Sequence, residues 1–163
     1  MSETVTIRLA KENMKFSAAH FTIFNAHERE RLHGHNFRVE ADIEARMLGN
    51  GMCFDYGIYK DRIVALCREL NEWMILPTRS PYLRVEETGD QVYALFDGQR
   101  IPFLRSDVLL LPIENATLEE FAAWFLQRLG EDREALRAHA ITAMEVRVFS
   151  GPGQSAGRRM AVA

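Results

Sequence analysis

A long run of alternating apolar and polar residues, positions 35–47, constrains the fold more than any other feature of this chain. The apolar members, two positions apart, are Phe37, Val39, Ala41, Ile43 and Ala45. Successive side chains of a strand point to opposite faces, so this period predicts one buried and one solvent-facing surface. Such half-buried strands are typical of antiparallel sheets. We expect further strands over residues 15–24 and 143–149.

Two amphipathic helices are expected to cover one face of that sheet. The first spans residues 56–73, and its apolar stripe consists of Ile63, Leu66, Cys67 and Leu70. The second begins at Thr117, which forms a capping box with Glu120, and ends at Gly130. The sequence therefore predicts an α+β fold, an antiparallel sheet with two helices on one face.

The segment between the two helices, residues 78–115, is too long for a plain loop. It contains Asp97-Gly98 between two extended runs, which is a strong signal for a two-residue hairpin turn. No repeat or linker divides the 163 residues. We therefore expect a single domain of residues 1–163 with an inserted β-hairpin at about 78–115.

Composition and charge argue against several classes of protein. A net charge of −3 and a pI near 6.0 do not suit a general nucleic-acid binder. No apolar stretch reaches the roughly 18 residues that would cross a membrane, and the first residues lack a secretory signal pattern. Two cysteines, Cys53 and Cys67, are too few for a disulfide framework, which fits a protein of the reducing cytoplasm. Both are expected to be buried.

Three histidines are predicted to meet on the apolar side of the sheet. His33 and His35 begin the long strand two positions apart, so both rings share the face of Phe37. His20 lies on the expected preceding strand, at an even-numbered position like the apolar Phe16 and Ala18, so its ring should point to the same buried face. Three imidazoles suit Zn²⁺ and leave a fourth position for water or substrate, which is typical of a catalytic site. The alternative is that His33-Gly34-His35 forms a turn with two satisfied histidines.

A run of alternating charges, residues 28–31, directly precedes this motif. Such a run is usually a solvated face of the protein. However, Glu30 or Glu28 lies near enough in sequence for its carboxylate to reach whatever the metal holds. A thiol nucleophile is not expected, because neither cysteine has an activating partner adjacent in sequence.

Four segments of the sequence form a recognisable set: Phe-Ser-Ala-Ala-His at 16–20, Leu-His-Gly-His-Asn-Phe at 32–37, Gly-Met-Cys-Phe-Asp-Tyr at 51–56 and Ala-Thr-Leu-Glu-Glu-Phe-Ala at 116–122. Together they resemble the 6-pyruvoyltetrahydropterin synthase/6-carboxytetrahydropterin synthase family. The resemblance is collinear from about residue 14 to 156. It implies the tunnelling fold (T-fold), a homohexamer of two trimers with active sites between subunits, a small-molecule pterin substrate, and Zn²⁺ on His20, His33 and His35.

The chain departs from the family's pattern at three places. No cysteine precedes the His-Gly-His motif, and Glu30 stands where one branch of the family carries a glutamate. That branch resembles a dihydroneopterin aldolase, which releases 6-hydroxymethyl-7,8-dihydropterin. Asn71 and Glu72 replace an Asp–His pair that relays protons. Residues 148–151, Val-Phe-Ser-Gly, contain no carboxylate where the family has a glutamate that holds the pterin.

The resemblance leaves Thr117 and Glu119 as substrate-binding residues, and Glu30 and Glu72 as the candidates for proton transfer. We expect a zinc-dependent pterin lyase or synthase acting on 7,8-dihydroneopterin triphosphate or a related pterin, with retro-aldol cleavage favoured by Glu30. The pathway is left open between queuosine, folate and methanopterin-like synthesis. The alternative is a zinc-binding T-fold paralogue that has lost pterin turnover. A domain without a metal would require the histidine arrangement to be accidental.

Overall fold

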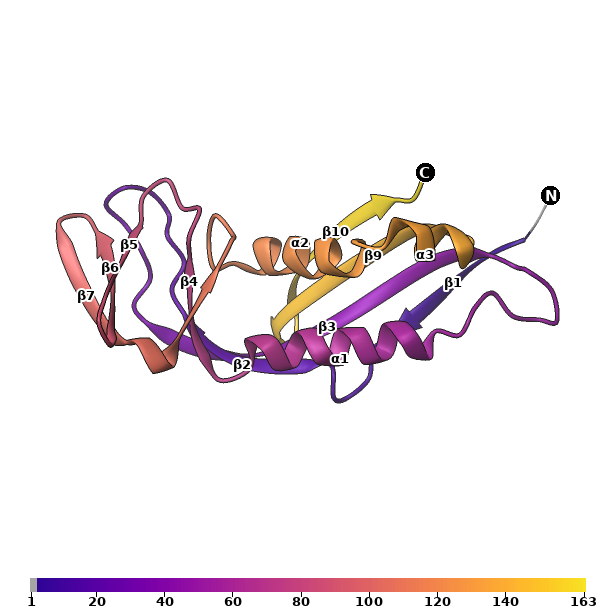
Figure 1. Cartoon of the computed structure of the whole chain (residues 1–163), viewed down its shortest axis with the longest axis horizontal. Helices are drawn as coiled ribbons and strands as arrows, with labels where there is room; N and C mark the ends of the chain where they lie inside the picture. The colour runs from indigo at the N-terminus through magenta and orange to yellow at the C-terminus, as the bar shows by residue number, and fades with distance from the viewer. Residues whose placement is uncertain (1–2) are drawn as a thin grey trace.

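The computed structural model describes residues 3–163. Ten strands, three α-helices and one 3₁₀ helix follow one another in these residues (Figure 1). In chain order they are β1 (Thr4–Leu9), β2 (Lys15–His20), β3 (His33–Arg46), α1 (Gly57–Leu70), β4 (Trp73–Pro77), β5 (Arg84–Thr88), β6 (Gln91–Phe96), β7 (Gln99–Leu104), η1 (Arg105–Asp107), β8 (Val108–Leu111), α2 (Leu118–Leu129), α3 (Arg133–Ala138), β9 (Ile141–Gly151) and β10 (Gln154–Ala161).

The main sheet is built around β3, the long strand that the alternating pattern predicts. Its strands lie in the order β10-β9-β3-β2-β4-β8, and β1 pairs with the second half of β3. The sheet is mixed, so the expectation of an antiparallel sheet is wrong at one side. There β4 runs parallel to both β2 and β8. The connection from β2 to β4 consists of β3, which runs antiparallel to β2, and of α1, and a long connection of this kind is what parallel strands need.

The predicted apolar face of β3 forms the core. Phe37, Val39, Ala41, Ile43 and Ala45 are each at most 1% exposed. They belong to one hydrophobic cluster with the buried residues of α1 and α2, which lie along the same face (Figure 1). Two helices on one face are therefore confirmed. The buried residues of α1 include the whole predicted stripe.

The structure corrects the predicted end of α1 and part of the predicted capping of α2. Helix α1 stops at Leu70 rather than at 73, because Asn71 is extended and Glu72 has a positive φ of 66°. Thr117 caps α2 as predicted, accepting the Glu120 N–H at 3.3 Å. The Glu120 carboxylate does not complete the box, since it accepts the Glu114 N–H at 2.8 Å.

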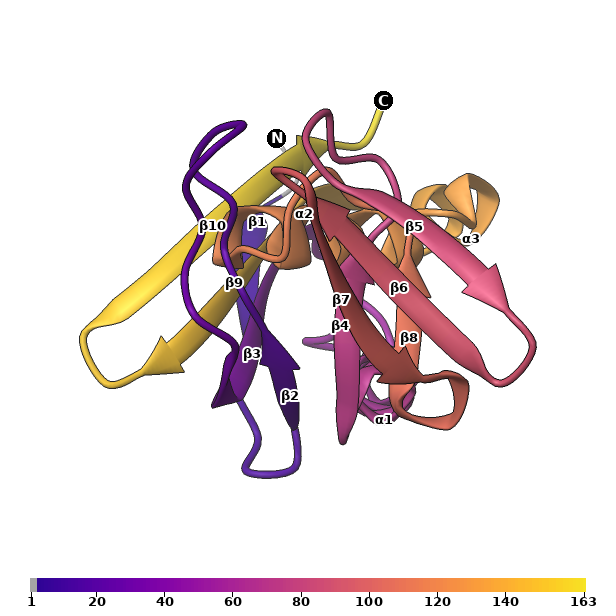
Figure 2. The same ribbon diagram turned by 90° about the vertical axis from the view of Figure 1, so that its left-hand side faces the viewer.

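A second sheet, β5-β6-β7, stands at one end of the molecule (Figure 2). We call it the small sheet. The predicted turn joins β6 to β7, and Asp97 and Gly98 both have positive φ, as a type I′ hairpin requires. The prediction of a hairpin misses the third strand, β5. The small sheet packs through Val92, Ala94 and Phe96 against a second hydrophobic cluster.

Other elements were not expected from the sequence. These are β1, β4, β8, β10 and α3. Strand β2 ends at His20 and not at 24, because residues 21–30 form a turn of their own. Within residues 3–163, none of the helices has the length and apolar character needed to cross a membrane.

Candidate active site

Strand pairing brings His20, His33 and His35 together. The register of β2 and β3 places His20 directly opposite His33, and His35 follows two residues along the same face. One nitrogen from each ring lies within 4.8 Å of the others. The ring centres are 4.7–5.2 Å apart. We refer to these residues as the histidine triad.

Two rings of the triad use Nδ1 to hydrogen-bond to backbone carbonyls. His20 Nδ1–H donates to the Ala116 carbonyl and His33 Nδ1–H donates to the Arg31 carbonyl, each at 2.7 Å. A carbonyl oxygen only accepts, so each ring carries a proton on Nδ1, and in the neutral ring Nε2 is then the nitrogen with the free lone pair. His33 Nε2 lies 3.1 Å from His35 Nε2, where two lone pairs would repel unless a cation or a proton lay between them.

The buried member of the triad fits a metal ligand. His20 is 5% exposed, and its Nε2 has no hydrogen-bond partner among residues 3–163. A buried polar atom left unpaired costs about 1–3 kcal/mol, which coordination to a cation would offset. Burial also lowers the pKa of His20, and the neighbouring His33 and His35 act in the same direction. The neutral ring that results is the form that binds metals.

Glu30 lies beside the triad. Its Oε2 accepts the Thr22 N–H at 3.0 Å and lies 3.7 Å from His33 Nε2. Burial opposes ionisation of this carboxyl, but the hydrogen bonds from Thr22 and the attraction of His33 and His20 outweigh it and lower the pKa of Glu30. The charge run at 28–31 is therefore not uniformly solvated, because Glu30 and Arg29 are both half-buried.

A cavity of about 280 Å³ joins the triad to the start of α2. The predicted residues that line it are His20, His35, Glu30, Thr117 and Glu119. Ser150, from the segment 148–151 in which the resemblance leads one to expect a glutamate, also lines it. The structure thus gathers two of the three proposed metal ligands, one proposed proton acceptor and both proposed substrate-binding residues around one space.

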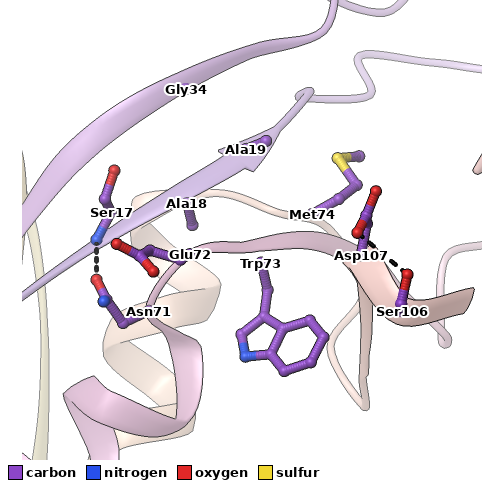
Figure 3. A pocket seen from close by; sticks show the side chains of 10 residues that line it. All are labelled: Ser17, Ala18, Ala19, Gly34, Asn71, Glu72, Trp73, Met74, Ser106 and Asp107. Atoms are coloured by element: carbon purple, nitrogen blue, oxygen red, sulfur yellow. Dashed lines mark hydrogen bonds between the residues drawn. The ribbon is translucent and has the colours of Figure 1, made fainter. Parts of the chain in front are cut away.

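Glu72 is not brought to this cavity within the chain. It lines a different pocket of about 620 Å³, together with Ser17, Asn71 and Asp107 (Figure 3). The two pockets share no residue. The Asn71 side chain accepts the Ser17 N–H at 2.9 Å, which ties the end of α1 to β2.

Sequence reasoning missed several residues that line the cavity. Thr22, Gln154 and Ser155 are polar and lie on its wall. Thr22 comes two residues after His20, so the alternation of side chains along an extended chain could have placed it on the same side as His20. Gln154 and Ser155 begin β10, a strand with no apolar alternation to reveal it.

Comparisons with known proteins identify the family. A family model described as 6-pyruvoyl tetrahydropterin synthase matches residues 8–160, so the chain belongs to this family. A protein of Methanocaldococcus jannaschii described as "Putative 6-carboxy-5,6,7,8-tetrahydropterin synthase" is 27% identical over 144 residues, which cover 88% of each chain. A protein of Pyrococcus horikoshii with the same description is 27% identical and covers 85% of this chain and 81% of its own.

Solved structures agree with this assignment. The 6-pyruvoyl tetrahydropterin synthase of Plasmodium vivax is 28% identical, with a TM-score of 0.92 over 98% of this chain and 99% of that one. The Plasmodium falciparum protein is 27% identical, with the same TM-score over 99% and 100% of the two chains. Two further P. vivax structures are of variants in which a catalytic glutamate is replaced by alanine or by cysteine. The fold is therefore the T-fold, in the α+β class, and the protein is a member of a family of pterin synthases.

Proposed function

We propose that this protein is a zinc-dependent pterin lyase that cleaves the side chain of 7,8-dihydroneopterin triphosphate or a related pterin. The observation that carries the proposal is the position of the Glu30 carboxylate, 3.7 Å from His33 Nε2 at the edge of the histidine triad. Family membership supports a pterin as the substrate.

His20, His33 and His35 are the residues that would hold the zinc. Their bare nitrogens and the unpartnered Nε2 of His20 fit such an ion. Zinc bound there would make a substrate hydroxyl more acidic. Three protein ligands leave room for that hydroxyl.

Glu30 would act as the proton acceptor. In retro-aldol cleavage the side-chain hydroxyl loses its proton and becomes a carbonyl, while the neighbouring carbon–carbon bond breaks. The electron pair of that bond stays with the carbon attached to the pterin, which then takes up a proton. A carboxylate suits the first step near neutral pH. The catalytic glutamate of the P. vivax relative supports this role for Glu30.

Thr117 and Glu119 would bind the pterin ring. Both line the cavity at the start of α2, and the Glu119 carboxylate can accept the N–H groups of an amino-pyrimidine edge. Ser150, which also lines the cavity, offers only a hydroxyl. Among the described residues that line the cavity, Glu119 and Glu30 are the ones with a carboxylate, and Glu30 has the proton-transfer role.

Glu72 would take part only between subunits. It lies in a separate pocket of its own chain, so a second copy would have to carry it to the triad. We propose the homohexamer of two trimers that the family resemblance implies as the assembly in which this occurs.

The second candidate is a zinc-binding T-fold paralogue without pterin turnover. Ser150 favours it, because this residue of the cavity wall offers a hydroxyl, and its segment, residues 148–151, has no carboxylate like the one that holds the pterin in the family. In this case the histidine triad would bind zinc, and the cavity would take a ligand that is not converted.

One experiment separates these functions. Purified zinc-loaded protein is incubated with 7,8-dihydroneopterin triphosphate, and the products are identified by mass spectrometry. We expect 6-hydroxymethyl-7,8-dihydropterin, the product of side-chain cleavage and a precursor of folate-type cofactors. A 6-carboxy product would instead indicate the route to queuosine, and a 6-pyruvoyl product would show proton shifts without cleavage. Unchanged substrate would favour the paralogue.

A further inference from the structure

Glu30 sits on a compact turn between β2 and β3. Ile23 bridges Arg29 across this turn, and the Glu30 N–H donates to the Thr22 carbonyl at 2.8 Å. At its tip the Asn25 side chain accepts the N–H groups of His27 and Glu28. These bonds give the turn its internal shape. They do not determine how the turn as a whole is oriented relative to the triad.

The small sheet contacts this turn at two places. The guanidinium carbon of Arg29 lies 5.0 Å from the ring centre of Phe21 and 5.9 Å from that of Phe96, the last residue of β6. One residue further on, the Asp97 carboxylate lies 2.9 Å from His27 Nδ1. Figures 1 and 2 both show the chain after β2 rising beside the small sheet.

Arg29 joins these contacts to the backbone of Glu30. Its Nη1 donates to the Glu30 carbonyl at 2.9 Å. That carbonyl belongs to the peptide unit that leaves Glu30, so holding it in place restricts the ψ angle of Glu30. The guanidinium is in turn held beside two buried aromatic rings, each at most 3% exposed. An arginine is suited to this task, because its planar group stacks on rings while its N–H groups donate in fixed directions.

We propose that Arg29 is a positioning residue through which the small sheet fixes Glu30 beside the histidine triad. This inference rests on the proposed role of Glu30 in proton transfer. Displacing a reacting group by about 1 Å can cost about a hundredfold in rate. The half-buried Arg29 therefore affects turnover without touching the substrate.

The first test compares the turnover of two arginine variants. Arg29→Met keeps an unbranched apolar side chain but removes the charge and the hydrogen bond. We expect kcat to fall by about tenfold to a hundredfold, with KM changed by less than about twofold and zinc content unchanged. Arg29→Lys should recover part of kcat. The matched control is Arg100→Met, since Arg100 stacks over Tyr93 in the small sheet.

A double-mutant cycle tests whether Arg29 acts through Glu30. In the Glu30→Gln background, Arg29→Met should cause no further loss of the residual turnover, because the group that Arg29 positions is already disabled. A full additional loss in that background would overturn the proposal. Normal kcat in Arg29→Met, with wild-type Glu30, would also overturn it.

Hydrogen exchange gives a readout that does not depend on activity. Amides of residues 21–32 should exchange faster in Arg29→Met than in wild type or Arg100→Met, while those of β3 stay protected. Equal exchange in all three proteins would overturn the positioning role. If wild type cleaves no pterin, the proposed function fails, and exchange still decides whether Arg29 orders the turn. If Arg29→Met does not fold, Arg29→Lys takes its place in the same measurements.

Discussion

The Nδ1–H of His20 donates to the carbonyl of Ala116 at 2.7 Å, although the two residues are 96 positions apart in the sequence. Ala116 is fully buried and directly precedes Thr117, the N-cap of α2. The start of α2 therefore fixes both the tautomer and the orientation of the buried histidine. A histidine that binds a metal commonly donates its other N–H to such an acceptor. The same helix start also brings Thr117 and Glu119 to the cavity.

The first prediction concerns the metal. Purified protein should contain about one zinc per chain, and His33→Ala or His35→Ala should remove it, because two histidines do not define a tetrahedral site. Metal analysis by mass spectrometry after dialysis measures this. His27→Ala is the control, since His27 is exposed and pairs with Asp97 away from the triad. Full zinc occupancy in both triad variants would refute the metal site.

The second prediction concerns Glu30. Glu30→Gln should lower the rate of side-chain cleavage by about a hundredfold or more while zinc stays bound, because the amide keeps the shape of the carboxylate but cannot accept the proton. The rate of product formation and the zinc content are measured on the same sample. Glu28→Gln is the control, as Glu28 is exposed and bonds only within the tip of the turn. If Glu30→Gln cleaved normally, Glu72 or Glu28 would have to be considered as the proton acceptor.

The two-residue alternation of side chains along the strands was enough to predict the buried face of β3 and the histidine triad. Strand β3 has a period of two over many residues, so its buried face and the placement of His33 and His35 follow from local geometry. His20 could be included because it lies on the neighbouring strand with inward parity. Contacts that depend only on the nearest strands are those that sequence reasoning recovers best.

Long-range packing decided the features that were missed. Strand β10 has no apolar alternation, and it forms because β9 offers it an edge. The parallel pairing of β4 with β2 depends on the path of α1 and not on the residues of either strand. The direction of the Glu72 side chain could not be predicted from the sequence, because it depends on the positive φ that Glu72 adopts just after the end of α1.

The third prediction separates the two tasks of Thr117. Its oxygen accepts the Glu120 N–H, so its hydroxyl hydrogen is free to donate to a ligand in the cavity. Thr117→Ala should lower the free energy of unfolding by about 1 kcal/mol and raise KM, because both the cap and the donor are lost. Thr117→Asp should keep the cap and raise KM alone. Urea unfolding and steady-state kinetics check this, and equal KM values in both variants and wild type would contradict a substrate role.

The fourth prediction concerns pH. Arg8 on β1 donates two hydrogen bonds of 2.8 Å to Asp42 on β3, and these lower the pKa of Asp42 below its ordinary value of 3.8 in spite of burial. A depressed pKa means that the unfolded chain binds the proton first. The stabilisation is therefore complete above about pH 3.8 and is lost as the pH falls through the folded pKa.

Asp42→Asn tests this pair. The variant should be less stable than wild type at pH 6, and the difference should shrink as the pH falls below 3.8. Urea unfolding at a series of pH values measures it. Asp61→Asn, on the exposed side of α1, should match wild type throughout. A constant difference between Asp42→Asn and wild type at all pH values would contradict the linkage.

The fifth prediction concerns assembly. Within residues 3–163, β8 and β10 end the main sheet, and neither has a partner on its outer edge. Open edges promote uncontrolled pairing unless another chain covers them, and Phe24 and Leu32 add exposed apolar surface beside the active-site turn. Light scattering at micromolar concentration should give about six times the chain mass of 18.7 kDa, independent of further dilution over about tenfold. A monomer would contradict the hexamer. It would also leave Glu72 without a route to any histidine triad, so catalysis would then depend on Glu30 alone.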